Sequence, residues 1–179
     1  MESDRARDLA RSLLAEPLPR RWAHTEGVAA QADRLAAVAG DDADLLTAAA
    51  WLHDVGYSPG LVKTGFHPLD GARYLRDVEH VDDRLCRLVA HHSCATIEAE
   101  ERGLIAELVA EFPPEPDNLT EALIYCDMTT DPAGSLVDFD TRLDEIPRRY
   151  GPGDVVSRSM RRAAPAIRRA ISHIEQRMV

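Results

Sequence analysis

Cysteine and long apolar runs are both scarce in this sequence. Its three cysteines, Cys86, Cys94 and Cys126, are an odd number without C-x-x-C spacing, which argues against a disulfide framework and against a zinc ribbon. No apolar run approaches the roughly 20 residues of a membrane span, and the first residues lack the apolar stretch of a signal peptide. We therefore expect a cytoplasmic protein with no membrane partner and with reduced cysteines.

Positive charge is also in short supply. The chain has 21 Lys and Arg against 31 Asp and Glu, which gives a formal net charge of −10 at pH 7. This acidity opposes binding to long nucleic acids, whose affinity depends mostly on neutralising phosphates. A small phosphorylated substrate such as a nucleotide is compatible with it, because a bound metal ion can supply positive charge locally.

Strand patterns are missing as well, whereas apolar residues recur at helical spacing along the chain. The composition, 45% hydrophobic and 29% charged, is that of a globular protein. We expect one all-α domain over residues 1–179, whose last helix offers a surface for a homodimer. The expected helices cover about 4–15, 20–39, 43–55, 68 onward, 82–92, 98–111, 119–128, 140–150 and 154–176.

Histidine is concentrated in one part of the chain, because six of the seven histidines lie between His24 and His92. His53 is followed at once by Asp54 near an expected helix end. Adjacent helical residues point about 100° apart, but a helix end can turn both side chains toward one cavity. Helices that bring in His24 and Asp127 would complete a His/Asp metal site, which favours Fe, Mn, Zn or Mg over a thiolate-type site.

The order His24, His53-Asp54, Asp127 resembles that of the HD superfamily of metal-dependent phosphohydrolases. The resemblance spans about residues 20–132. Ala50-Trp-Leu-His53-Asp54-Val-Gly56 is similar to the family's His-Asp signature, and Leu123-Ile-Tyr-Cys-Asp127 is similar to its later helix that ends in an aspartate. The resemblance implies an HD-domain helical bundle for the metal-site core, followed by C-terminal helices over 138–177.

Two further segments resemble the dinuclear HD-GYP phosphodiesterases and, less closely, HD-type dinucleoside tetraphosphate hydrolases. They are His67-Pro-Leu-Asp-Gly71-Ala-Arg-Tyr-Leu75 and Val89-Ala-His91-His92. The resemblance implies two divalent metal ions per chain, with Fe or Mn expected first and Mg, Zn, Co or Ni as alternatives. In this interpretation Asp54 bridges two metals, one bound by His24, His53 and Asp127 and the other by His67, His91 and His92.

The Gly-Tyr-Pro loop of those phosphodiesterases is absent, because Ser93-Cys-Ala-Thr follows the paired histidines. Cyclic di-GMP is therefore not the expected substrate. The leading hypothesis is a phosphohydrolase that acts on a nucleotide or another small phosphate ester through a metal-activated water, with Asp54 at its centre. Lys63, in the loop before His67, would contact a substrate phosphate as a compact point charge, or would be a solvated loop lysine.

Two other functions fit the same ligand set. Some relatives in this superfamily are mixed-valent di-iron oxygenases, and their ligands would look the same in the sequence. A third hypothesis is a non-catalytic sensor domain that binds a metal or a nucleotide without turnover.

Overall fold

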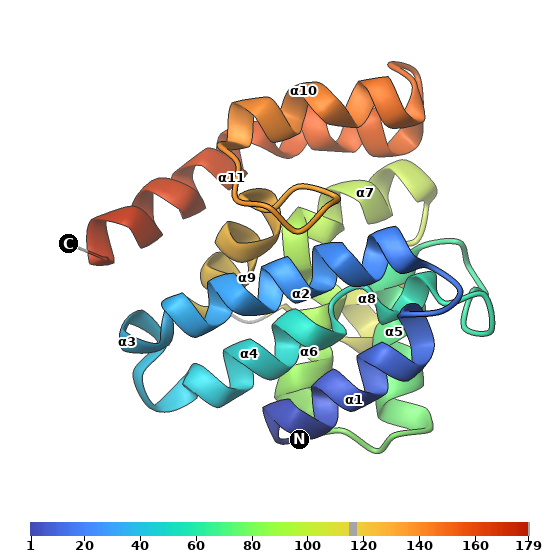
Figure 1. Cartoon of the computed structure of the whole chain (residues 1–179). Coiled ribbons are helices and arrows are strands. Elements are labelled where there is room, and N and C mark those ends of the chain that lie inside the picture. The colour runs from blue at the N-terminus through green and yellow to red at the C-terminus, as the bar shows by residue number, and fades with distance from the viewer. Residues whose placement is uncertain (115–117, 179) are drawn as a thin grey trace.

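The computed structural model describes residues 1–114 and 118–178, and the fold within them is all-α, as predicted (Figure 1). Thr130 and Leu136 form an isolated antiparallel β-bridge. None of the helices in the described residues is long and apolar enough to cross a membrane. The elements, with 3-10 helices labelled η, are α1 (Ser3–Leu14), α2 (Pro19–Arg34), α3 (Ala36–Ala39), η1 (Gly40–Asp42), α4 (Ala43–Leu52), η2 (Val55–Tyr57), α5 (His67–Asp77), α6 (Asp83–His91), η3 (His92–Cys94), α7 (Ala95–Arg102), α8 (Ile105–Glu111), α9 (Asn118–Met128), α10 (Phe139–Tyr150) and α11 (Val155–Arg177).

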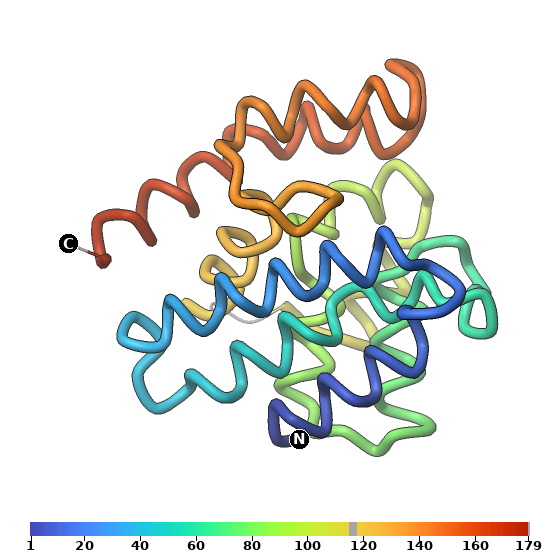
Figure 2. Tube along the Cα trace, in the orientation of Figure 1, coloured from blue at the N-terminus to red at the C-terminus, as the bar shows by residue number. Residues whose placement is uncertain are grey.

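The helices pack around a continuous core of buried apolar side chains. On one side α4 packs against both α1 and α2, while α6 and α9 pack against α4 from within the molecule. The C-terminal helices α10 and α11 form an antiparallel hairpin at the top of the view in Figure 2, and α11 continues along α7 and α9. Helix α11 thus packs along α9, whose last turn carries Asp127, a predicted metal ligand.

Aspartates fix where three of the helices begin. The carboxylates of Asp82, Asp138 and Asp154 each accept a hydrogen bond from a backbone N–H in the first turn of α6, α10 and α11. These are N-caps, which satisfy N–H groups that have no partner inside the helix. The expected start of the last helix at residue 154 differs from the observed one by a single position.

Two expected helices are broken in the structure. The segment 98–111 forms α7 and α8 instead of one helix, because Gly103 between them has a left-handed backbone with φ of 72°. The segment 20–39 is interrupted at Leu35, whose ψ of 6° lies outside the helical range. Both breaks depend on backbone angles that apolar spacing does not encode.

A close backbone crossing between η2 and α5 positions several of the predicted metal ligands. A Cβ atom added to Gly56 would lie 2.0 Å from the carbonyl oxygen of His67 and 2.7 Å from the backbone nitrogen of Gly71. Only glycine allows the two backbones to approach so closely. The crossing holds His53 and Asp54, which directly precede η2, beside the first turn of α5.

We expect Gly56→Ala to lower the free energy of unfolding by about 1–3 kcal/mol, because the methyl group forces apart two packed backbone segments. Urea unfolding followed by circular dichroism measures the change. The matched control is Gly60→Ala, where an added Cβ meets nothing within 4 Å and the change should stay within about 0.5 kcal/mol. Equal effects at both glycines would contradict the importance of the crossing.

Candidate metal centre

Six buried or half-buried side chains, from α2, α5, η3, α9 and the segment that follows α4, converge below the α10–α11 hairpin. They fall into two groups of three, and within each group one ligand atom per residue lies within 4.8 Å of the others. Each group could therefore hold a metal ion. The first group is His24, His53 and Asp127, and the second is Asp54, His67 and His92.

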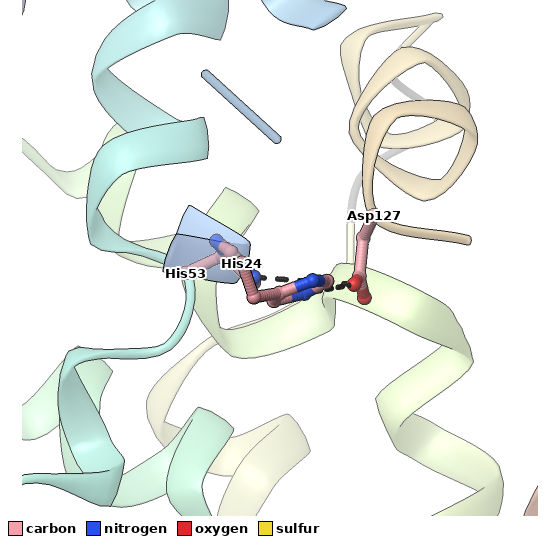
Figure 3. A group of neighbouring side chains, drawn as sticks. All are labelled: His24, His53 and Asp127. Atoms are coloured by element: carbon pink, nitrogen blue, oxygen red, sulfur yellow. Dashed lines mark hydrogen bonds and ion pairs between the residues drawn. The ribbon is translucent and has the colours of Figure 1, made fainter. Parts of the chain in front are cut away.

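The first group joins residues from α2, the end of α4 and the last turn of α9, and its side chains point toward one another in Figure 3. The Nε2 atom of His24 lies 2.9 Å from Oδ1 of Asp127. The Nε2 atom of His53 lies 4.0 Å from the same oxygen. All three side chains are buried, so any charge here has to be balanced within the protein.

Asp54 links this group to the second one. Its Oδ1 atom lies 3.3 Å from Nε2 of His67, and that nitrogen lies 3.0 Å from Nε2 of His92. Its Oδ2 atom faces the first group and lies 3.3 Å from Nε2 of His53. The carboxylate of Asp54 therefore lies between the two groups, with one oxygen toward each.

Backbone carbonyl groups fix the orientation of three of the imidazole rings. The Nδ1–H group of His24 donates to the carbonyl oxygen of Asp131 at 3.0 Å. Those of His53 and His92 donate to the carbonyl oxygens of Ala50 and Val89, each at 2.7 Å. Because a carbonyl oxygen only accepts, Nδ1 carries a proton in each ring and Nε2 is left facing the cluster. Metal-binding histidines are held in the same way.

The free Nε2 atoms show that the cluster fits a metal ion. That of His53 is buried and has no hydrogen-bond partner. Nitrogen lone pairs that face carboxylates repel them unless a proton or a cation lies between, and a divalent cation would satisfy several of them at once. Imidazole and carboxylate ligands together suit ions such as Mn, Fe and Zn.

Electrostatics keeps the two carboxylates and the ring of His92 in the charge states that a metal needs. Burial works to raise the pKa of Asp54, but Arg21 outweighs it and holds that pKa well below its usual range. Burial likewise opposes ionisation of Asp127, whose pKa is nevertheless lowered, mainly by the adjacent His24. Burial lowers the pKa of His92 to about 3. At neutral pH the cluster therefore combines two carboxylates with a neutral His92 ring.

A comparison with known families agrees with this geometry. The family model described as HD domain matches residues 21–128, more than half of the chain. The chain belongs to the HD-domain family. No curated protein and no solved structure matched it. HD domains bind divalent metals and are typically hydrolases. All six clustered residues, which we call the HD cluster, lie within the matched segment.

His91 is the one predicted ligand that the structure places apart from the HD cluster. It is the last residue of α6, and its Nε2 atom lies 2.6 Å from the carbonyl oxygen of Phe112. The helix ends between His91 and His92, so the two rings point in different directions. The second group therefore consists of His67, His92 and Asp54, which was expected to bridge the two metals, without His91.

The cation nearest the HD cluster is Arg21, which the sequence reasoning missed. Lys63 has an exposed side chain, and its backbone N–H donates to Asp70 at 3.1 Å. Arg21 instead donates from Nη1 to Oδ2 of Asp54 at 2.7 Å. It precedes His24 by three residues on α2, and such a spacing places two side chains on one helix face. This three-residue spacing from His24 could have identified Arg21 from the sequence.

An aromatic stack connects Arg21 to the second group. The guanidinium carbon lies 4.1 Å from the centre of the Tyr57 ring, and that ring stacks on His67 at 3.9 Å with an interplanar angle of 18°. Burial raises the pKa of Tyr57 well above its usual value, so the phenol stays protonated. Tyr57 thus braces both the arginine and the imidazole of His67.

The turn after α6 orients Asp127. Ser93 and Cys94 are consecutive non-glycine residues in left-handed conformation, with φ of 53° and 59°. This strained turn brings the Ser93 hydroxyl to Oδ2 of Asp127, to which it donates a hydrogen bond. The other oxygen of Asp127 is left facing His24. Strain of this kind is typical of functional sites, where surrounding packing maintains it.

We expect His92→Gln to lower the metal content per chain, whereas His91→Gln retains the wild-type content. The two residues are neighbours with the same chemistry, but only the ring of His92 faces Asp54 and His67. Elemental analysis of protein purified without chelator measures the outcome. Metal loss in His91→Gln together with retention in His92→Gln would contradict this assignment.

We also expect Ser93→Ala to weaken metal binding by about 10–100-fold, the usual cost of losing a group that orients a ligand. Competition with a fluorescent chelator measures the affinity. Ser172→Ala, on the exposed side of α11, is the control and should bind as the wild type does. Unchanged affinity in Ser93→Ala would mean that Asp127 is held by other contacts.

Proposed function

We propose that this protein is a metal-dependent phosphohydrolase that cleaves a phosphoester or phosphoanhydride bond of a nucleotide or another small phosphorylated metabolite. The observation that carries the proposal is the position of Asp54. Each oxygen of its carboxylate faces a different group of candidate ligand atoms, so Asp54 would serve both groups if each held a metal ion. Bound ions would supply Lewis-acid chemistry there, which polarises a phosphoryl oxygen and lowers the pKa of water.

The residues of the chain would orient the ligand atoms and bind the phosphoryl group. The backbone-held rings of His24, His53 and His92 keep their Nε2 atoms aimed at the centre, so little reorganisation is needed during the reaction. Arg21 is the positive side chain at the edge of the cluster. Its guanidinium, which matches a phosphoryl group in geometry, would donate to one of the oxygens of that group.

A narrow cavity beside the cluster supports access to these groups. It is lined by ligand residues together with Arg21, Tyr57 and the end of α10. Its volume of about 50 Å³ suits a phosphoryl group or a few waters and is far below the roughly 300–1,000 Å³ of a typical ligand pocket. The reacting group can therefore enter, while the rest of a substrate has to lie outside this cavity.

The test is phosphate release by the purified chain loaded with Mn²⁺, Mg²⁺ or Zn²⁺, with nucleotides and phosphomonoesters as substrates. We expect turnover at about two metal equivalents per chain, and Asp54→Asn should lower kcat by at least about 100-fold because metal catalysis supplies several kcal/mol. Asp41→Asn, an exposed carboxylate in η1, is the matched control and should retain activity.

Three outcomes would overturn the proposal. One is the absence of phosphate release with every metal. The second is oxygen uptake by the iron-loaded protein that depends on substrate, which would mark a di-iron oxygenase. The third is a nucleotide that binds tightly but stays unchanged after long incubation, which would mark a sensor domain.

A further inference from the structure

A second, larger cavity adjoins the metal centre, and of the predicted ligands in the described residues His24 alone lines it. It lies between the start of α2 and the end of α10, which both lie on the right of the view in Figure 1. Arg21, Arg149 and Tyr150 line both this cavity and the narrow one beside the metal ligands. The two cavities therefore meet at these three side chains.

The size of the second cavity fits a small ligand. Its volume is about 380 Å³, which lies within the range of small-molecule pockets. Since the narrow cavity at the metal centre has room for a phosphoryl group alone, the remainder of a substrate can extend past Arg21 into this larger space.

The side chains that line the cavity are positively charged, although the protein as a whole is acidic. The chain has a net charge of −10, yet the described residues that line this cavity include Arg20, Arg21 and Arg149 and no carboxylate. Arg20 is exposed. Arg149 approaches Glu145 at 3.6 Å, and its side chain is 26% exposed, so that pairing is weak.

The backbone adds to this positive potential. Helix α2 begins at Pro19, its first residues line the cavity, and its N-cap Leu18 offers no side-chain hydrogen bond. The backbone N–H groups of the first turn of a helix lack partners inside the helix, and the helix dipole places partial positive charge there. Together with the three arginines, this end of α2 favours an anion.

Tyr150 pre-orients one of the arginines. The guanidinium carbon of Arg149 lies 4.6 Å from the centre of the Tyr150 ring, and both side chains line the cavity. Stacking on a ring limits the rotamers of the arginine, so that less entropy is lost when it binds a ligand.

We propose that this cavity, which we call the arginine pocket, binds a second phosphate of the substrate, so that the enzyme acts on molecules with at least two phosphate groups. One phosphate occupies the metal centre beside Arg21, and the other is bound by Arg20, Arg149 and the start of α2. The reaction of the first phosphate rests on the function proposed above, whereas binding of the second does not.

The experiment compares the binding of inorganic pyrophosphate and inorganic phosphate to the full chain by titration calorimetry in buffer saturated with Mg²⁺. Wild-type protein should bind pyrophosphate at least tenfold more tightly than phosphate. Arg149→Gln and, separately, Arg20→Gln should each weaken pyrophosphate binding by roughly tenfold, the effect of losing a charged hydrogen bond. Their affinity for phosphate should change by less than about twofold, since the metal centre is intact.

Arg148→Gln is the matched control, because Arg148 precedes Arg149 on α10, is exposed and carries the same charge. It should bind both anions as the wild type does. Thermal unfolding of each variant checks that it is folded, and Arg20→Gln, on a different helix, keeps the test decisive if Arg149→Gln fails to fold.

The arginine pocket is overturned if wild-type protein binds pyrophosphate no more tightly than phosphate. It is also overturned if the two pocket variants bind pyrophosphate as Arg148→Gln does, or if they lose affinity for both anions equally, since that would place the arginines at the metal centre alone. None of these readouts needs turnover, so a failure of the arginine pocket is distinguishable from a failure of phosphohydrolase activity.

Discussion

The buried negative charge of Asp54 and Asp127 is the constraint on which the site depends. A carboxylate taken out of water costs several kcal/mol unless it is paired and hydrogen-bonded. Here both are ionised. Asp54 is paired with Arg21 at 2.7 Å, and Asp127 accepts a hydrogen bond from the hydroxyl of Ser93. These contacts leave further Nε2 atoms directed at the same small volume. A cation bound there would relieve the repulsion, so metal binding and the stability of this region are coupled.

Helix ends are the means by which the fold gathers these groups. His53 caps α4, His67 begins α5, His92 directly follows α6, and Asp127 lies in the last turn of α9. Within a helix, neighbouring side chains diverge by about 100°, so His53 and Asp54 can share a cluster only because the helix stops at Leu52. The backbone crossing at Gly56 then keeps that stop beside α5.

The sequence was sufficient for the fold class and for the family, because both depend on patterns along the chain: apolar spacing for helices, and an ordered set of His and Asp for the HD domain. It could not separate His91 from His92. Which of the two rings faces the cluster depends on where α6 ends and on the left-handed turn at Ser93 and Cys94. The residue types at these positions do not predict such backbone angles. Arg21 was more accessible to prediction, since a cation one helical turn before His24 shares its face.

The family match ends at residue 128, whereas the end of α10 lies beyond it. This division has a physical meaning. The matched segment supplies all six clustered ligand residues, so it sets the chemistry that any bound metal can perform. Arg149 and Tyr150 belong to the later segment, yet they line the space through which a substrate would approach those ligands. Function resides in sites added to a fold, and the same metal centre could serve different substrates when different C-terminal helices cover it. The C-terminal hairpin, rather than the HD signature, is therefore where the choice of substrate would be made.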